Sequence, residues 1–160
     1  MKLGRLNHIG VATPDLDASI AFYRDVMGAT DITEPFVLES QQVRVCFVNT
    51  PGENGTAGTQ IELLQPTAAD SAVGKWLEKN PLGGQHHICY EVPDILAAKA
   101  WFESLGKRVL GADRGEGGID DFTLRIGLGI GDRSGQLLGD RHGIVLLGRP
   151  RESGLDLDCV

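Results

Sequence analysis

The sequence predicts an α+β fold built from two βαβββ modules, and two observations lead to this class. The first is an internal repeat, because residues 6–15 reappear about eighty positions later as residues 85–94. In both copies a His-Ile pair opens an apolar strand, and a Pro-Asp pair follows six residues after the histidine. The second is that each copy leads into an amphipathic helix ending in glycine and then into further strand patterns. The repeat therefore gives His8 and His87 equivalent places on two like strands.

Composition limits the class of protein. The chain has 160 residues, of which 41% are hydrophobic and 23% charged, as expected for one compact domain with a full core. A net charge of −7 without a basic run argues against nucleic-acid binding. The three cysteines lack metal-type spacing and are expected in the core. No leader and no apolar run of ~18 residues are present, so we expect no membrane contact and a cytoplasmic location.

The first half reads as β-α-β-β-β. In the strand at residues 5–13, Ile9 and Val11 share one face and His8 shares the other with small residues. Pro14-Asp15 caps a helix that ends at Gly28, and its apolar stripe comprises Leu16, Ile20, Phe22, Tyr23 and Met27. Strands are expected at 30–40, 43–48 and 59–65, the last with Glu62 on the face opposite Ile61 and Leu63.

A linker helix at residues 70–80 leads to the second half, whose first strand covers residues 84–92. Matching the repeat places His87 inward with His8 and leaves His86 on the other face, where it packs behind the strand and orients the site. The next helix, residues 94–106, is expected to bury Ile95, Ala98, Trp101, Phe102 and Leu105. A strand at 107–110, a glycine-rich loop or insertion at 111–143, and strands at 144–147 and 155–158 follow.

Two strand histidines and Glu62 form a candidate metal site, since imidazole and carboxylate together suit a divalent first-row ion. The duplication predicts a fourth ligand from the last strand, where alternation does not choose between Asp156 and Asp158. The plainer alternatives are hydrogen-bonded core histidines, a solvent-facing Glu62, and aspartates that blunt an exposed strand edge.

Several segments carry a resemblance that covers residues 3–110. They include Leu6-Asn7-His8-Ile9-Gly10-Val11, Ile61-Glu62-Leu63-Leu64-Gln65-Pro66, the linker helix from Asp70 to Asn80, and Gly84-Gln85-His86-His87-Ile88. On these residues the chain resembles the vicinal oxygen chelate superfamily and, within it, the methylmalonyl-CoA epimerase family. The linker helix is the segment most specific to that family.

The resemblance implies one domain, residues 1–160, whose two βαβββ modules form a cupped sheet around a divalent metal. Module one spans about 3–66, the linker helix about 70–80, and module two about 84–160 with a Gly-rich insertion at about 111–143. The implied ligands are His8, Glu62, His87 and a carboxylate near the C-terminus. Counting from Gly154 places Asp158 where the family has a glutamate that is both ligand and proton-transfer base. The closing strand departs from the family pattern, and Val45 stands where some members carry a second acidic base.

By resemblance, the expected function is metal-dependent epimerisation of methylmalonyl-CoA at C2 through an enolate, with Asp158 as a catalytic base. Cobalt is the metal that the resemblance favours, while zinc, manganese, nickel or magnesium would also fit. The partner is a small acyl-CoA substrate, and a homodimer is expected. Two alternatives remain open: another superfamily enzyme, such as a glyoxalase-like lyase or a dioxygenase, or a catalytically impaired ligand-binding member.

Overall fold

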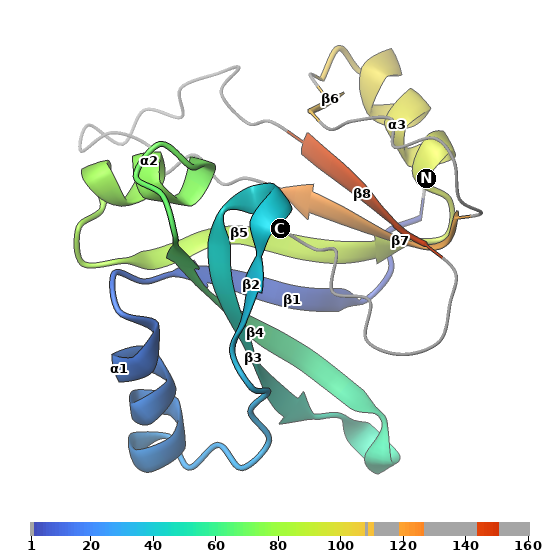
Figure 1. Cartoon of the computed structure of the whole chain (residues 1–160). Coiled ribbons are helices and arrows are strands. Elements are labelled where there is room, and N and C mark those ends of the chain that lie inside the picture. Colours follow the sequence, from blue (N-terminus) through green and yellow to red (C-terminus); the bar gives the residue numbers. More distant parts are fainter. Residues whose placement is uncertain (1, 108, 111–118, 127–143, 151–160) are drawn as a thin grey trace, which may run out of the picture. The chain divides into compact units, whose positions relative to one another are not determined.

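The computed structural model describes residues 2–107, 109–110, 119–126 and 144–150 (Figure 1). The chain divides into two compact units, one formed by Asn7–His87 and the other by Met1–Leu6 with Ile88–Val160. Strand β5, Gly84–Val92, begins in the first unit and continues into the second. Each unit is described in turn below.

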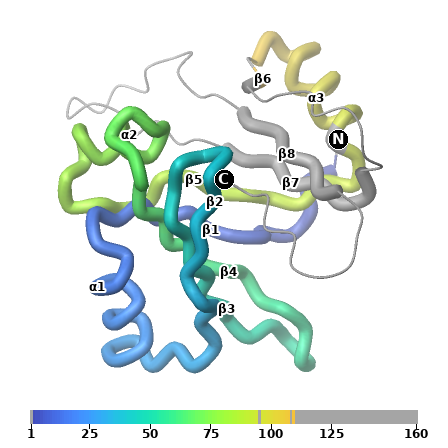
Figure 2. Tube along the Cα trace, viewed as in Figure 1, coloured from blue at the N-terminus to red at the C-terminus, as the bar shows by residue number. Residues whose placement is uncertain are grey.

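The first βαβββ motif consists of β1 (Leu6–Ala12), α1 (Leu16–Ala21), β2 (Phe36–Leu38), β3 (Val43–Pro51) and β4 (Ala57–Pro66). Its strands lie in the order β2-β3-β4-β1, with β1 parallel to β4 and the other pairs antiparallel. Short 3₁₀ turns at Glu39–Gln41 and Glu53–Gly55 join β2 to β3 and β3 to β4. This succession, which Figure 2 traces along the chain, confirms the order predicted for the first half.

Helix α1 covers one face of this sheet (Figure 1). Its N-cap is Asp15, whose Oδ1 accepts a hydrogen bond from the Ala18 N–H at 3.0 Å. Leu16 is fully buried in a cluster with Cys46, Val48 and Leu63, so this side of the sheet is apolar core. Burial raises the pKa of the Cys46 thiol, in keeping with the core role expected for that cysteine.

The helix does not continue as a regular α-helix to Gly28. A π-helical turn, Phe22–Val26, follows α1 and rotates the later side chains relative to the expected stripe. Tyr23 still packs against the core, but Phe22 and Met27 are exposed. The prediction that these last two residues are buried is therefore wrong.

Helix α2, Ala72–Lys79, links the two motifs. Its N-cap is Ser71, whose hydroxyl accepts a hydrogen bond from the Gly74 N–H. The chain then turns at Gly83, where φ is +77° and an added Cβ would lie 2.5 Å from the Ala12 carbonyl oxygen. Only glycine fits this close approach without strain. The turn fixes where β5 starts.

The second βαβββ motif consists of β5, α3 (Ile95–Ser104), β6 (Val109–Leu110), β7 (Ile119–Ile126) and β8 (Ile144–Pro150). Its strand order is β5-β7-β8-β6, with β6 parallel to β8 and the other two pairs antiparallel. Strand β7 lies inside residues 111–143, so the expectation of a loop there is wrong over Ile119–Ile126. Pairing with both β5 and β8 stabilises this strand despite its glycine-rich flanks.

Helix α3 is capped by Asp94, whose Oδ1 accepts from the Ala97 N–H at 2.9 Å. Ala98 is fully buried as expected, but Trp101 and Leu105 are exposed, so their predicted burial is wrong. Helical spacing identifies an apolar face without saying how much of it a neighbour covers. Among the residues that the structure describes, no helix is both long and apolar enough to span a membrane.

Candidate metal centre

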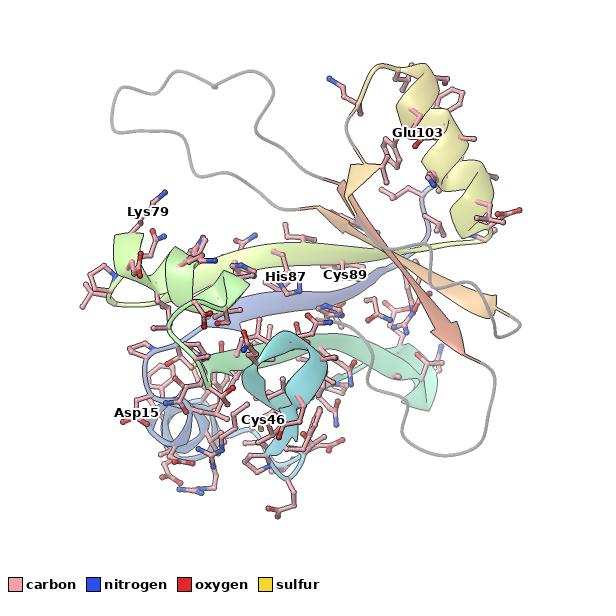
Figure 3. The ribbon with its side chains drawn as sticks, turned by 45° about the horizontal axis from the view of Figure 1, so that its top comes forward. Asp15, Cys46, Lys79, His87, Cys89 and Glu103 are labelled. Carbon is pink, nitrogen blue, oxygen red and sulfur yellow. The ribbon has the colours of Figure 1, made fainter. Side chains whose placement is uncertain are left out.

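Three strands of the unit Asn7–His87 bring His8, Glu62 and His87 together. His8 lies on β1 and Glu62 on β4, and the parallel register pairs Gly10 with Glu62 and His8 with Gln60. Because side chains alternate along a strand, His8 and Glu62 point to the face opposite the α1 core. His87, which Figure 3 labels on β5, belongs to the same group of donor atoms. The three ligands predicted from the described part of the sequence therefore converge.

The donor atoms of this cluster lie close together. His8 Nε2 and His87 Nε2 are 3.1 Å apart. Glu62 Oε2 is 3.1 Å from His87 Nε2 and 3.5 Å from His8 Nε2. The exposed fraction of the side chain is 1% for each histidine and 0% for Glu62. The geometry thus gathers two imidazole nitrogens and a carboxylate oxygen in a site shielded from water.

This donor set fits a divalent first-row metal ion. Ligand atoms about 2.1 Å from one ion and at right angles to each other lie about 3 Å apart, close to the observed separations. Two histidines and one carboxylate on one side of an ion leave positions open for water or substrate. Gathering the three donors in a buried place is costly unless a cation joins them. The residues present therefore match the metal that the sequence predicted.

Gly10 leaves the space that the His87 ring occupies. A Cβ built on Gly10 would lie 1.9 Å from His87 Cε1 and 2.2 Å from its Nδ1. Any side chain at this position would displace the imidazole. The sequence shows that small residues flank His8, but it does not show that the partner histidine fills the space.

Each ligand histidine also contacts the residue before it. His8 Nδ1 lies 2.8 Å from Asn7 Oδ1, and His87 Nδ1 lies 3.0 Å from His86 Nδ1. His86 is half-buried, and its ring meets Trp76 edge to face. His86 therefore contacts a predicted ligand, and its orienting role stays a prediction. The contact of Asn7 was missed, although its position directly before His8 is a signal that could have suggested it.

The sequence also drew attention to the aspartates of the last strand and to Val45. Asp156 and Asp158 lie outside the described residues, so the role of Asp158 as ligand and base stays a prediction. Val45 is fully buried on β3, where the register pairs it with Leu64, and Phe47 pairs with Glu62. The ring of Phe47 also stands edge-on to His8. Apolar side chains therefore lie on β3 beside the carboxylate ligand, and Val45 cannot transfer a proton.

Comparisons with known proteins agree with this arrangement. The family model described as the Glyoxalase/Bleomycin resistance protein/Dioxygenase superfamily matches residues 7–123. The ethylmalonyl-CoA/methylmalonyl-CoA epimerase of Cereibacter sphaeroides is 46% identical over 110 residues, which cover 69% of this chain and 77% of that protein. The mitochondrial methylmalonyl-CoA epimerase of Mus musculus is 47% identical over 97 residues, covering 61% of this chain and 51% of that protein.

The fold is also similar to that of solved methylmalonyl-CoA epimerase structures. A variant of the Streptomyces coelicolor methylmalonyl-CoA epimerase, in complex with 2-nitronate-propionyl-CoA, superposes with a TM-score of 0.66 at 34% sequence identity. The alignment covers 91% of this chain and 97% of the other. The matched family model includes His8, Glu62 and His87 and spans well over half of the sequence. The chain belongs to the Glyoxalase/Bleomycin resistance protein/Dioxygenase superfamily.

Proposed function

We propose that this chain catalyses the metal-dependent epimerisation of methylmalonyl-CoA at C2. The observation that carries the proposal is the buried cluster of His8, Glu62 and His87, whose donor atoms are spaced to hold one divalent ion. The relatives support the substrate, since those named above are methylmalonyl-CoA or ethylmalonyl-CoA/methylmalonyl-CoA epimerases. A solved relative with 34% sequence identity is a methylmalonyl-CoA epimerase in complex with methylmalonyl-CoA.

A 2-methylmalonyl thioester offers two oxygens to such a site, one from the thioester carbonyl and one from the free carboxylate. A bound divalent ion would supply Lewis-acid polarisation of that carbonyl. This polarisation stabilises the enolate that the substrate becomes when its C2 proton is removed. His8, Glu62 and His87 would hold the ion. The neighbouring Phe47 and Val45 supply apolar surface, which limits the access of water to the reacting carbon.

Epimerisation needs one group that takes the C2 proton on one face and another that returns a proton on the opposite face. We assign the first role to Asp158, which would also complete the metal ligands. Its carboxylate takes the proton as the C2–H electron pair moves into the enolate. The second base is unassigned because Val45 stands at the place where some relatives have an acid.

The remaining features of the proposal come from the resemblance and from the comparisons. The metal is proposed to be cobalt, with zinc, manganese, nickel or magnesium as the other candidates. We also propose that residues 1–160 act as one domain of two modules, that two copies form a homodimer, and that the enzyme is cytoplasmic. The acyl-CoA substrate requires cations for its phosphates, which the sequence offers in several lysines and arginines.

Exchange of the C2 proton tests the function directly. Methylmalonyl-CoA and ethylmalonyl-CoA are incubated in D₂O with metal-free protein and with protein loaded with cobalt, and deuterium at C2 is followed by NMR. We expect rapid incorporation only in the loaded sample. No incorporation in either sample would contradict the proposal, and turnover of methylglyoxal hemithioacetal or of a catechol instead would identify another superfamily activity.

The role of Asp158 needs a matched pair of variants. Asp158→Ala should lower both the exchange rate and the cobalt content, because the residue is proposed as base and ligand. Asp156→Ala removes a carboxylate two residues away and should leave both unchanged. The reverse pattern would show that Asp156 takes this role.

A further inference from the structure

Each ligand histidine is held through Nδ1 by the residue immediately before it on the same strand. On β1, the Asn7 Oδ1 lies 2.8 Å from His8 Nδ1. On β5, the His86 Nδ1 lies 3.0 Å from His87 Nδ1. Successive side chains leave a strand on opposite faces, so a contact between neighbours is not imposed by strand geometry. Its occurrence at both histidines indicates a shared task.

Asn7 shows what that task is. Its amide oxygen only accepts hydrogen bonds, so His8 must carry its proton on Nδ1 to make this contact. A neutral imidazole has one proton, so the lone pair of His8 then lies on Nε2. This is the atom 3.1 Å from His87 Nε2 and 3.5 Å from Glu62 Oε2. The side chain of Asn7 thereby selects the tautomer that can bind a metal.

The pair on β5 is different, because an imidazole nitrogen can either donate or accept. If the His86 Nδ1–H donates, a neutral His87 must carry its own proton on Nε2, where it faces both Glu62 and the Nε2 lone pair of His8 and cannot be a ligand. If His86 Nδ1 accepts, the proton of His87 lies on Nδ1 and its Nε2 lone pair is available. Only the second arrangement is compatible with metal binding at His87.

We infer that His86 is a positioning residue that accepts the His87 Nδ1–H and so keeps Nε2 of His87 as a metal ligand. In this tautomer the proton of His86 lies on its Nε2. The ring of Trp76, 5.5 Å from the His86 ring between centroids and at 87° to it, holds His86 from the linker helix α2. The inference rests on the metal site of the proposed function and adds to it the group that sets one ligand.

Two substitutions separate hydrogen bonding from packing. His86→Leu removes both the acceptor and the contact with Trp76. His86→Asn also removes the ring contact but supplies an amide oxygen, as Asn7 does for His8. Cobalt is titrated into the metal-free full-length protein, and its dissociation constant is measured from the absorption of the bound ion. We expect His86→Leu to weaken cobalt binding about 10- to 100-fold, and His86→Asn to stay within about threefold of the wild type.

The cobalt affinities of the two variants show whether the hydrogen bond of His86 or its ring contact with Trp76 matters. Equal weakening in both variants would show that the ring contact matters and would overturn the inference, as would unchanged affinity in His86→Leu. Wild-type protein that binds no cobalt would instead contradict the proposed function. Histidine ¹⁵N spectra of the zinc-loaded wild type provide a test that needs no variant. We expect the protons on His87 Nδ1 and His86 Nε2, and a proton on His86 Nδ1 would overturn the inference.

Discussion

The two βαβββ motifs begin alike and then pair their strands differently. In the first, β1 lies parallel to β4, and the residue two positions after His8, Gly10, pairs with Glu62. In the second, β5 lies antiparallel to β7, and the residue two positions after His87, Cys89, pairs with Arg125. Among the described residues, the strand paired with β5 therefore places an arginine, not a carboxylate, two positions beyond the histidine. Within the described residues, the three donors of the candidate metal site come from the first motif and from β5.

The shared part of the motifs is local. Asp15 and Asp94 cap their helices in the same way. Each carboxylate accepts a hydrogen bond from the backbone N–H three residues later, at 3.0 Å for Asp15 and 2.9 Å for Asp94. The strand and the first helical turn are fixed by neighbouring residues, so a repeated sequence gives a repeated structure there. The order of the later strands depends on distant partners. Sequence repetition therefore predicts the start of each motif better than its sheet.

Replacing Glu62 should give the largest effect, because the candidate metal site depends on this residue of the first motif. Glu62→Leu removes a proposed ligand and should weaken cobalt binding more than ~100-fold. This loss exceeds the one expected for removing a residue that only hydrogen-bonds to a ligand. The control is Arg125→Gln, at the residue that pairs with Cys89 on β5, and it should leave cobalt affinity unchanged. Cobalt titration of both proteins checks this. Loss of cobalt binding in Arg125→Gln would show that the second motif also shapes the metal site.

Gly10 gives the next largest effect. Gly10→Ala should weaken cobalt binding about 100-fold, because the new Cβ would overlap the His87 ring. Gly28→Ala is the control: φ is +73° there and no other residue lies within 4 Å of an added Cβ, so it should lower stability without changing cobalt affinity. Cobalt titration and thermal unfolding are measured for both. Wild-type affinity in Gly10→Ala would show that His87 can be held elsewhere.

The two helix caps should contribute equally if the motifs begin alike. Asp15→Ala and Asp94→Ala should each lower the free energy of unfolding by about 1 kcal/mol, which for a chain of this size is about 2–4 °C in Tm. The Asp→Asn variants keep the capping oxygen and should be near wild type. Thermal and urea unfolding measure both quantities. A cost at Asp15 with none at Asp94 would show that the second motif unfolds separately.

The smallest effect concerns an ion pair that joins β3 to α1 in the first motif. Arg44 on β3 binds both carboxylate oxygens of Asp17 on α1, and this hydrogen bonding lowers the pKa of Asp17. Because the folded pKa lies below the unfolded value of about 3.9, the stabilisation is full above that value and is lost as the pH falls through the folded pKa. Arg44→Gln should therefore reduce Tm slightly at neutral pH and flatten its decline below about pH 4. An identical acid decline in both proteins would contradict this.

Much of the site could be predicted from the sequence, because strand alternation fixes which side chains share a face. His8, His87 and Glu62 follow from that rule together with the repeat. The overlap of Gly10 with His87 could not be predicted, since it depends on the distance between two strands. Nor could the exposure of Trp101 on α3, which depends on how much of the helix a neighbour covers. Strand β7 was missed because glycine-rich flanks hide a segment that long-range pairing stabilises.

The centre also bears on how the chain resists unfolding. His8 and His87 are 79 residues apart in sequence, yet their Nε2 atoms lie within 3.1 Å. A metal ion held by both would close a long loop, as a disulfide does, and would restrict the unfolded chain only as long as it stays bound. Since an ion that binds only the folded state stabilises it by mass action, each tenfold rise in free metal above the dissociation constant adds about 1.4 kcal/mol. Metal supply would then set the thermal stability of the protein as well as its activity.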